Sequence, residues 1–502
     1  MSEVSRRSFI THTALLGGGL AAGFMAPGAQ AAVTQAAAGA AAAAKADPLL
    51  AFRSGLELAE LIRSKALSSA ELTRYFIARI ERFDGRLNAI VVRTFEAALE
   101  SARAADAALA KGQMLGALHG LPMTIKESFN LKGTATTWGL PDLANNIATT
   151  DSAMVTRYRK AGAHFMGKTN VPLMLGDFQS YNDVYGTTSN PWNTERTPGG
   201  SSGGSAAALA AGLTGLDSGS DIGGSIRNPA HYCGVYGHKP TWGVVPPQGH
   251  STPGVLSTPD LAVMGPMARS AADLAAAMDI VAGPDVMNAS GWRLDLPPPR
   301  MKSLGELRVA LWSDHAIAPV DREIADRVQQ VGEVLTRRGA RVSDSARPEF
   351  AGGQSHELYL KLLLAVIGQA PGDNIDHQQW MGLDNARTGL RLGWQAFFRD
   401  WDILVCPIMS TTAPPHDHSP QAARMIEVNG EPVPYMNQVF WAGHATLSYL
   451  PSTVFPTGLS SGGLPLGLQA IGPEFGDRTT IEFARLMADE LGGFVPPPGY
   501  GD

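Results

Sequence analysis

Two short segments rich in glycine and serine decide the fold: Thr197-Pro198-Gly199-Gly200-Ser201-Ser202-Gly203-Gly204-Ser205 and Gly219-Ser220-Asp221-Ile222-Gly223-Gly224-Ser225-Ile226-Arg227. The stretch Ala206 to Ala211 between them predicts a short helix, after which the chain can fold back and bring the two loops together. Glycines beside a serine permit unusual backbone conformations and leave N–H groups free to contact a ligand. Acyl transfer needs such N–H groups to stabilise an oxyanion, and Ile222, Gly223, Gly224 and Ser225 offer a run of them.

A nucleophilic serine also needs a base. Lys126 is the candidate, because it ends a short apolar strand predicted from Met123 onward, after Gly120-Leu121-Pro122. Burial lowers the pKa of a lysine by up to roughly 3–5 units, which leaves a neutral amine near neutral pH. The residues therefore point to serine chemistry that uses a lysine in place of a histidine.

The rest of the chain alternates helical and extended patterns. Ser68 and Glu71 form a capping-box pattern before a helical repeat of apolar residues. Further on, strands are expected at 307–312, 341–342 and 403–405, a helix whose inner face is Ile324, Val328, Val331 and Leu335, a hairpin over 448–471 and a last helix over 479–491. This pattern predicts an α/β fold, a single domain with a central mixed β-sheet flanked by α-helices. Residues 345–400 look least regular, and their aromatic residues suggest a cover facing the substrate.

The motifs resemble those of the amidase signature family. The resemblance covers most of residues 50–495, and two Gly/Ser loops at this spacing make it specific. It is carried by Gly120-Leu121-Pro122 with Lys126, Gly167-Lys168-Thr169-Asn170, Asn190-Pro191-Trp192, the loop at 199–205, the segment 221–227, Cys233-Gly234, Lys239-Pro240-Thr241, the segment 402–407 and Gly463-Leu464-Pro465-Leu466-Gly467-Leu468-Gln469. His238 departs from the family, which commonly has leucine there, and a structural histidine is expected.

The resemblance implies a Ser-cisSer-Lys triad, with Ser225 as nucleophile, Ser201 as proton relay and Lys126 as base. It implies amide hydrolysis through an acyl-enzyme, without metal or organic cofactor. The N–H groups of Ile222, Gly223, Gly224 and Ser225 would form the oxyanion hole. Leu175 aligns with a position that lines the acyl pocket in the family's fatty acid amide hydrolases. Asp221 and Arg227 are expected to hold the loops by ion pairing.

Composition and the N-terminal segment restrict the expected binding partners and the expected cellular location. The 502 residues carry a net charge of −6 without a basic patch, so nucleic acid is not an expected partner. Cys233 and Cys406 make no disulfide framework and are expected to be buried. Arg6-Arg7 precedes a mild apolar region and Ala29-Gln30-Ala31, which together predict a twin-arginine signal peptide over 1–31. An alanine-rich linker, 32–46, and the catalytic domain, 47–496, would follow in a periplasmic or secreted protein without an integral membrane span.

Three other motifs compete with this interpretation. Gly199 to Gly203 matches G-x-S-x-G, which would make Ser201 the nucleophile of an α/β-hydrolase, although the residues before it are not an apolar strand. Gly162 to Thr169 matches the phosphate-loop pattern, but its apolar strand falls inside the gap. His416-Asp417-His418 has no further metal ligand at a useful spacing and is expected to be a solvated loop.

The substrate is the open point. The expected partner is a small amide, with aryl amides, fatty amides, carbamates and esters all within reach of this chemistry, and aromatic residues in 345–400 favour an apolar or aryl acyl group. Esterase or urethanase activity on the same triad, and a non-catalytic amide-binding subunit, stay open. A family member that releases ammonia from glutamine for tRNA-linked amidation is disfavoured by the export signal. The oligomeric state is open, a homodimer included.

Overall fold

The predicted alternation of strands and helices is present in the computed structural model, which describes residues 49–368 and 375–501. The expected export signal and linker lie outside the described residues. The helices are α2 (Gly55–Arg63), α3 (Ser69–Phe83), α4 (Phe95–Ala110), α5 (Ala153–Lys160), α6 (Gly203–Ala210), α7 (Arg227–Cys233), α8 (Ala271–Val281), α9 (Arg322–Arg337), α10 (Gly353–Ile367), α11 (His377–Asp400), α12 (Val439–Leu447) and α13 (Asp477–Leu491). The strands are β1 (Ile90–Arg93), β2 (Pro122–Lys126), β3 (His164–Thr169), β4 (Tyr181–Asn182), β5 (Gly186–Thr187), β6 (Asp217–Asp221), β7 (Tyr236–Lys239), β8 (Val263–Ala268), β9 (Arg308–Leu311), β10 (Arg341–Ser343), β11 (Ile403–Cys406), β12 (Met425–Val428), β13 (Glu431–Pro434), β14 (Ser452–Leu459) and β15 (Pro465–Ile471).

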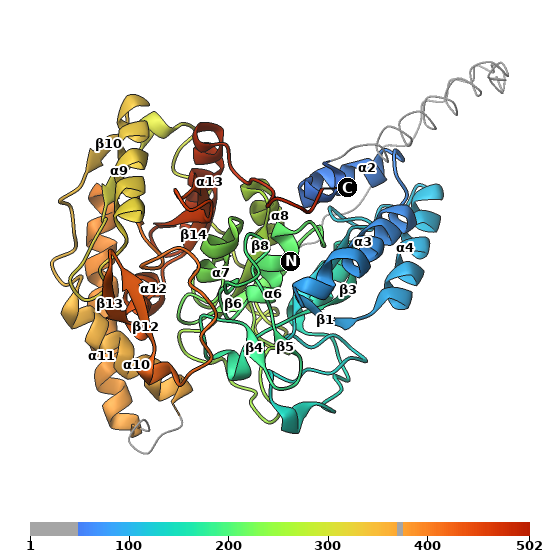
Figure 1. Ribbon diagram of the computed structural model, residues 1–502, viewed down its shortest axis with the longest axis horizontal. Coiled ribbons are helices and arrows are strands. Elements are labelled where there is room, and N and C mark those ends of the chain that lie inside the picture. Colours follow the sequence, from blue (N-terminus) through green and yellow to red (C-terminus); the bar gives the residue numbers. More distant parts are fainter. Residues whose placement is uncertain (1–48, 369–374, 502) are drawn as a thin grey trace, which may run out of the picture.

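The largest sheet confirms the predicted α/β class with a central mixed sheet. Its eight strands run in the order β10-β9-β11-β15-β14-β7-β8-β6. β10, β9 and β11 are parallel neighbours, whereas the other pairings are antiparallel. A smaller sheet has the order β1-β3-β2 and lies with α3 and α4 at the opposite side of the molecule from α9 to α11 (Figure 1).

The two sheets meet where β2 approaches β6. The Thr124 N–H donates to the Leu216 carbonyl at 3.2 Å, and the Thr124 hydroxyl donates to the Asp217 carboxylate. Both strands are buried along their whole length. This junction sets Lys126, at the end of β2, beside the segment that leads from β6 into the second Gly/Ser loop.

Local sequence rules explain the helices that were predicted. Ser68 and Glu71 form the expected capping box at the start of α3, since each side chain pairs with the other's backbone N–H. In α9, Ile324, Val328 and Val331 recur at helical spacing and are buried, as expected. The hairpin is formed by β14 and β15.

The prediction that 345–400 is irregular is wrong. Most of this stretch is helical, in α10 and in α11, which begins with a capping box between Asp376 and Gln379. The inner face of α10 carries Tyr359, Leu362 and Leu363 at the spacing of a helix, a pattern that its continuous apolar composition conceals. Among the helices of residues 49–368 and 375–501, none has the length and hydropathy that a bilayer crossing requires.

The two Gly/Ser segments are also more regular than expected. Helix α6 begins at Gly203, inside the first segment, and strand β6 includes Gly219 to Asp221 of the second. Glycine is required in these elements because no side chain would fit. A Cβ at Gly204 would lie 2.3 Å from the Asn170 backbone nitrogen, and one at Gly219 would lie 2.4 Å from the Ser202 hydroxyl oxygen. Close approach of neighbouring groups therefore explains these glycines.

Candidate active site

Lys126 lies fully buried at the end of β2, with its amine between two hydroxyl groups. Its Nζ is 2.6 Å from the Ser201 Oγ and 3.0 Å from the Ser220 Oγ. Burial lowers the pKa of Lys126 to about 7, although the charges of Asp221 and Asp217 act in the opposite direction. A lysine in this state can exchange protons with a serine near neutral pH.

Ser201 sits at the end of a tightly packed turn. The Gly200–Ser201 peptide bond is cis, and the Gly200 N–H donates to the Asn228 Oδ1 at 2.9 Å. A Cβ at Gly200 would lie 2.3 Å from the Asp177 carbonyl oxygen, so no larger residue fits there. The following Ser202 N–H donates to the Ser225 carbonyl at 3.0 Å. That bond joins the two Gly/Ser loops, one of which carries Ser201 in contact with Lys126 and the other Ser225.

Ser225 lies in the turn between β6 and α7, and the Asp221 carboxylate organises this turn. The carboxylate accepts the N–H groups of Gly224 at 2.9 Å and Ile226 at 3.1 Å. It also pairs with the Arg227 guanidinium through two bonds, of 2.9 and 3.0 Å. Burial by itself would raise the pKa of Asp221, but the Arg227 charge and these bonds outweigh it and hold the pKa at about 2. Asp221 and Arg227 thus hold the loop as an ion pair, the role expected for them.

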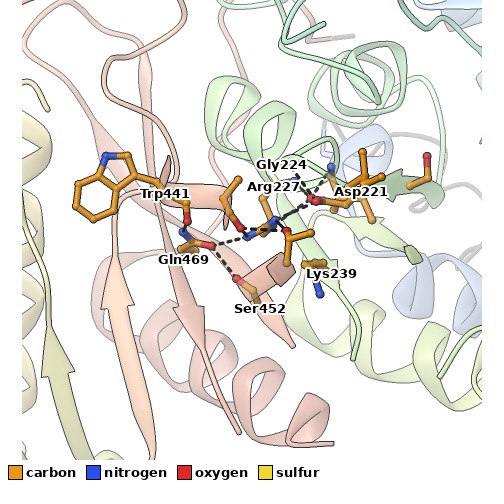
Figure 2. Close-up of polar contacts among 12 residues, drawn as sticks. Asp221, Gly224, Arg227, Lys239, Trp441, Ser452 and Gln469 are labelled. Atoms are coloured by element: carbon orange, nitrogen blue, oxygen red, sulfur yellow. Dashed lines mark hydrogen bonds and ion pairs between the residues drawn. The ribbon is translucent and has the colours of Figure 1, made fainter. Parts of the chain in front are cut away.

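Arg227 links the Ser225 turn by hydrogen bonds to the C-terminal strands, as Figure 2 shows. Its guanidinium donates to the Gln469 Oε1 at 2.9 Å, and Gln469 donates to the Trp441 carbonyl and accepts from Ser452. Both members of the Asp221–Arg227 pair have fully buried side chains. The turn that presents Ser225 is therefore fixed by a satisfied buried network rather than by solvent-exposed contacts.

The carbonyl groups of the Ser225 turn are also held in place. The Tyr359 hydroxyl donates to the Ile222 carbonyl at 2.8 Å, and the Asn228 N–H donates to the Gly224 carbonyl at 2.6 Å. Because Asp221 already accepts the Gly224 N–H, that group is not free for a substrate. The N–H groups of Ile222, Gly223 and Ser225 have no hydrogen-bond acceptor among residues 49–368 and 375–501. Three of the four N–H groups expected to bind an oxyanion therefore have no protein acceptor, and Gly224 is the exception.

A cavity of about 50 Å³ adjoins Ser225 and has largely apolar walls. Its walls come from the loop at 175–178, the Ser225 turn, α10, η7 (Tyr435–Gln438) and α12, through Leu175, Gly176, Asp177, Phe178, Ile222, Gly223, Leu363, Ile367, Met436 and Val439. Leu175 lines this cavity, at the position that the sequence indicated. Ile367 and Met436 are partly exposed, at 47% and 39%, and form its solvent side.

Asp177 is the charged residue of this wall, and sequence reasoning missed it. Its carboxylate accepts the Arg424 guanidinium at 2.6 Å and the Tyr435 hydroxyl at 2.8 Å. Arg424 also donates to the Tyr181 hydroxyl at 2.7 Å. Asp177 and Arg424 are nearly fully buried, so the wall presents a neutralised pair to the cavity. Arg424 and Tyr435 lie far from Asp177 in the chain, so no local sequence pattern predicts these contacts.

The α/β-hydrolase and phosphate-loop interpretations do not fit the structure. An irregular segment precedes Ser201 where a nucleophile elbow requires a strand, and Ser201 contacts Lys126. Gly162 to Thr169 contains β3 itself, and Lys168 donates to the Ala135 carbonyl and the Thr136 hydroxyl inside the protein. Neither motif therefore has the structural context that its chemistry needs.

The remaining residues singled out in the sequence make contacts typical of structural residues. His238 contacts the Thr453 hydroxyl and the Asp477 carboxylate through its two ring nitrogens, as expected of a structural histidine. His418 stacks on Tyr181, and the backbone of Asp417 is bound by Gln179. Cys233 and Cys406 are free thiols and buried, as predicted.

The aromatic residues of 345–400 do not line the cavity. Trp394 and Phe398 are buried in the main hydrophobic core, with Phe397 packed against it. Trp380 packs against a second buried cluster. The interpretation of these side chains as part of a substrate cover is wrong for all four, although α10, in the same stretch, does supply Leu363 and Ile367.

Known proteins resemble this chain in sequence and in fold. The family model Amidase matches residues 71–370 and 359–481. The chain is 32% identical to an indoleacetamide hydrolase of Bradyrhizobium diazoefficiens, over 88% of this chain and 86% of that protein. It is 32% identical to a glutamyl-tRNA(Gln) amidotransferase subunit of Moorella thermoacetica, over 87% of this chain and 96% of that protein. A bacterial aryl acylamidase of the amidase signature family has a similar structure, with a TM-score of 0.74, 25% identity, and coverage of 87% and 96% of the two chains. The chain belongs to the amidase signature family.

Proposed function

We propose that this chain is an exported serine amidase in which Ser225 is the nucleophile, Ser201 the proton relay and Lys126 the base. The observation that carries the proposal is the buried 2.6 Å contact between the Lys126 Nζ and the Ser201 Oγ, on a loop that is bonded to the Ser225 loop. A neutral amine in that position can take the Ser201 proton while Ser201 takes the proton of Ser225.

In the first half of the reaction the Ser225 Oγ attacks the amide carbonyl, and its proton passes through Ser201 to Lys126. The developing oxyanion is stabilised by the N–H groups of Gly223 and Ser225, which belong to the three of the four expected donors that have no protein acceptor. The C–N bond then breaks as the proton returns to the leaving nitrogen. In the second half, water attacks the acyl-enzyme and gives a proton to the same relay. The C–O bond to Ser225 then breaks, the acid leaves, and the relay returns the proton to the Ser225 Oγ.

The cavity supports an uncharged, apolar acyl group as substrate. Leu175, Phe178 and Val439 offer apolar contacts, and both carboxylate oxygens of Asp177 are already bonded. An acyl group larger than a few heavy atoms must displace the partly exposed Ile367 and Met436 at the solvent side. Glutamine, with a charged ammonium and carboxylate, would find no free counter-charge among the lining residues.

A substrate panel tests this assignment. The purified enzyme should hydrolyse anilides and primary amides of apolar acids, and kcat/KM should be at least about 10²-fold lower for glutamine, whose charges would be desolvated without partners. Matched acyl groups presented as an amide, an ester and a carbamate show whether the leaving group matters. Negligible turnover of all apolar amides, or a preference for glutamine, contradicts the proposal.

Export is proposed from the N-terminal sequence, where Arg6-Arg7 precedes an apolar stretch and Ala29-Gln30-Ala31. Expression of the full chain in a bacterium with a twin-arginine pathway should place most of the enzyme in the periplasm. Replacing Arg6 and Arg7 together by lysine should keep it in the cytoplasm, whereas Arg63→Lys, on the exposed face of α2, should not. Equal periplasmic amounts of all three proteins, measured after fractionation, would refute the export proposal.

A further inference from the structure

Tyr359 contacts the Ser225 turn from a distant part of the chain. It lies on α10, is fully buried, and its hydroxyl donates to the Ile222 carbonyl at 2.8 Å. Its ring packs against Gly443 of α12, where a Cβ would lie 2.6 Å from a ring carbon. α10 and α12 are neighbouring helices (Figure 1). The glycine in α12 therefore makes room for the tyrosine ring beside the loop.

The contact matters because a trans peptide points its C=O and N–H in opposite directions. With the Ile222 carbonyl bound to Tyr359, the Gly223 N–H must point to the other side of the same peptide plane. The Gly224 carbonyl, bound to the Asn228 N–H, fixes the direction of the Ser225 N–H in the same way. Asn228 lies at the start of α7, so its N–H bonds to the Gly224 carbonyl as part of the helical turn, whatever its side chain. The 222–223 peptide, by contrast, depends on the side chain of Tyr359.

The hydroxyl of Tyr359 is well suited to this task. Burial raises the pKa of Tyr359 far above its usual range, so its hydroxyl keeps its proton and can donate a hydrogen bond near neutral pH. Glycine at 223 has no side chain to restrict its backbone, and a Cβ there would meet the Tyr359 oxygen only at 3.6 Å. Without the Tyr359 bond, local sterics would therefore leave the 222–223 peptide free to rotate.

We propose that Tyr359 is a positioning residue that orients the 222–223 peptide so that the Gly223 N–H meets the oxyanion during amide hydrolysis. This inference rests on the proposed role of Ser225 as nucleophile. Its effect is exerted on the transition state, because the oxyanion forms only there, and substrate binding in the ground state is untouched. Tyr359 itself does not contact the reacting atoms.

The direct test is Tyr359→Phe, which keeps the ring and removes only the hydroxyl. We expect kcat to fall roughly 10- to 100-fold while KM for an apolar anilide stays within about twofold. The affinity of an aryl trifluoromethyl ketone, whose adduct with Ser225 carries an oxyanion, should fall by the same factor as kcat/KM. Unchanged kcat, or a loss confined to KM with unchanged ketone affinity, overturns the proposal.

Gly443→Ala provides an independent variant that keeps the hydroxyl but displaces the ring. It should show the same pattern of lowered kcat and ketone affinity with a conserved KM. Tyr158→Phe is the matched control, since Tyr158 is also fully buried and its hydroxyl is 2.7 Å from the Ser218 Oγ. The control should lower the melting temperature but leave kcat and ketone affinity within about twofold; an equal kinetic loss there would show that any lost buried bond suffices and would overturn the proposal.

Failure of the proposed function is distinguishable from failure of this inference. If a fluorophosphonate does not label Ser225 of the wild-type enzyme, the nucleophile is wrong. If Ser225 is labelled but Tyr359→Phe reacts at the wild-type rate with both the substrate and the probe, only the role of Tyr359 is wrong.

Discussion

Replacing Ser225 with alanine is expected to lower kcat/KM for amide hydrolysis by at least about 10⁴-fold and to abolish covalent labelling by a fluorophosphonate. The reason is that the alanine variant has no oxygen to form the acyl-enzyme, while the N–H donors and the cavity remain. KM should change little, because the side chain removed contributes only to the chemical step. Steady-state kinetics and intact-protein mass before and after exposure to the probe measure both effects.

Peptide mapping of the labelled wild-type enzyme separates the two serine interpretations. The probe mass should appear on Ser225, whereas an α/β-hydrolase would carry it on Ser201. Ser69→Ala serves as a control, because Ser69 is also buried and its hydroxyl donates to the Gly120 carbonyl rather than to a residue of the proposed triad. That variant should keep nearly full activity. Residual labelling or turnover in Ser225→Ala near the wild-type level would refute the nucleophile assignment.

Replacing Lys126 with methionine is expected to lower kcat by roughly 10²–10⁴-fold, the usual effect of losing a general base. Methionine fills similar space without leaving a buried charge, so the variant should fold. Probe labelling of Ser225 should slow by a comparable factor, since the same proton must leave. Lys168→Met is the matched control, because Lys168 is a buried lysine on the neighbouring strand β3 that bonds to Ala135 and Thr136.

The Lys168 control should lose stability rather than activity, since it removes the cation closest to the buried Glu127 carboxylate. Its folded fraction should retain kcat within about tenfold of the wild type. A Lys126→Met enzyme with wild-type kcat would contradict the relay.

The pH profile of the wild-type enzyme follows from the same lysine. Only neutral Lys126 can accept the proton, and its pKa is about 7, so kcat should rise with pH and level off above this value. One pH unit below the pKa the rate should be about tenfold lower than at the plateau.

Asp217 titrates in the same range, because burial raises its pKa to about 7 as well. Asp217→Asn identifies the group responsible: the Asp217 charge raises the Lys126 pKa, so its removal should move the midpoint of the profile to lower pH. If the rising limb disappears in this variant, Asp217 and not Lys126 controls it.

Local patterns were sufficient for most of the framework. The capping box at Ser68, the buried face of α9 and the β14–β15 hairpin follow from residues that are neighbours in sequence, and all three were predicted. The helix α10 was missed because apolar residues cover more than one of its faces, which hides the helical period. Strand β6 was missed because aspartate and glycine have low strand propensity, and its pairing with β8 overrides that preference.

The residues of the candidate site also form two groups: those that the sequence indicated and those that only the structure revealed. Lys126, Ser201 and Ser225 were identifiable because each lies within a motif whose residue types and spacing are set by the chemistry, whereas Leu175 was indicated only by the family resemblance. Asp177, Tyr359 and Arg424 were not, because each acts through a partner brought near only by folding. Such contacts leave no trace in nearby sequence, so only the structure reveals them.

The sequence by itself determined the two Gly/Ser loops, the candidate lysine and therefore the family, since short-range constraints on backbone and chemistry are written into consecutive residues. The tertiary structure alone decided which N–H groups of the Ser225 turn have no protein acceptor and which side chains line the adjoining cavity. The physical reason is that a peptide's orientation depends on where its carbonyl is bound. For the peptide between Ile222 and Gly223 that partner is a tyrosine hydroxyl on a helix far along the chain.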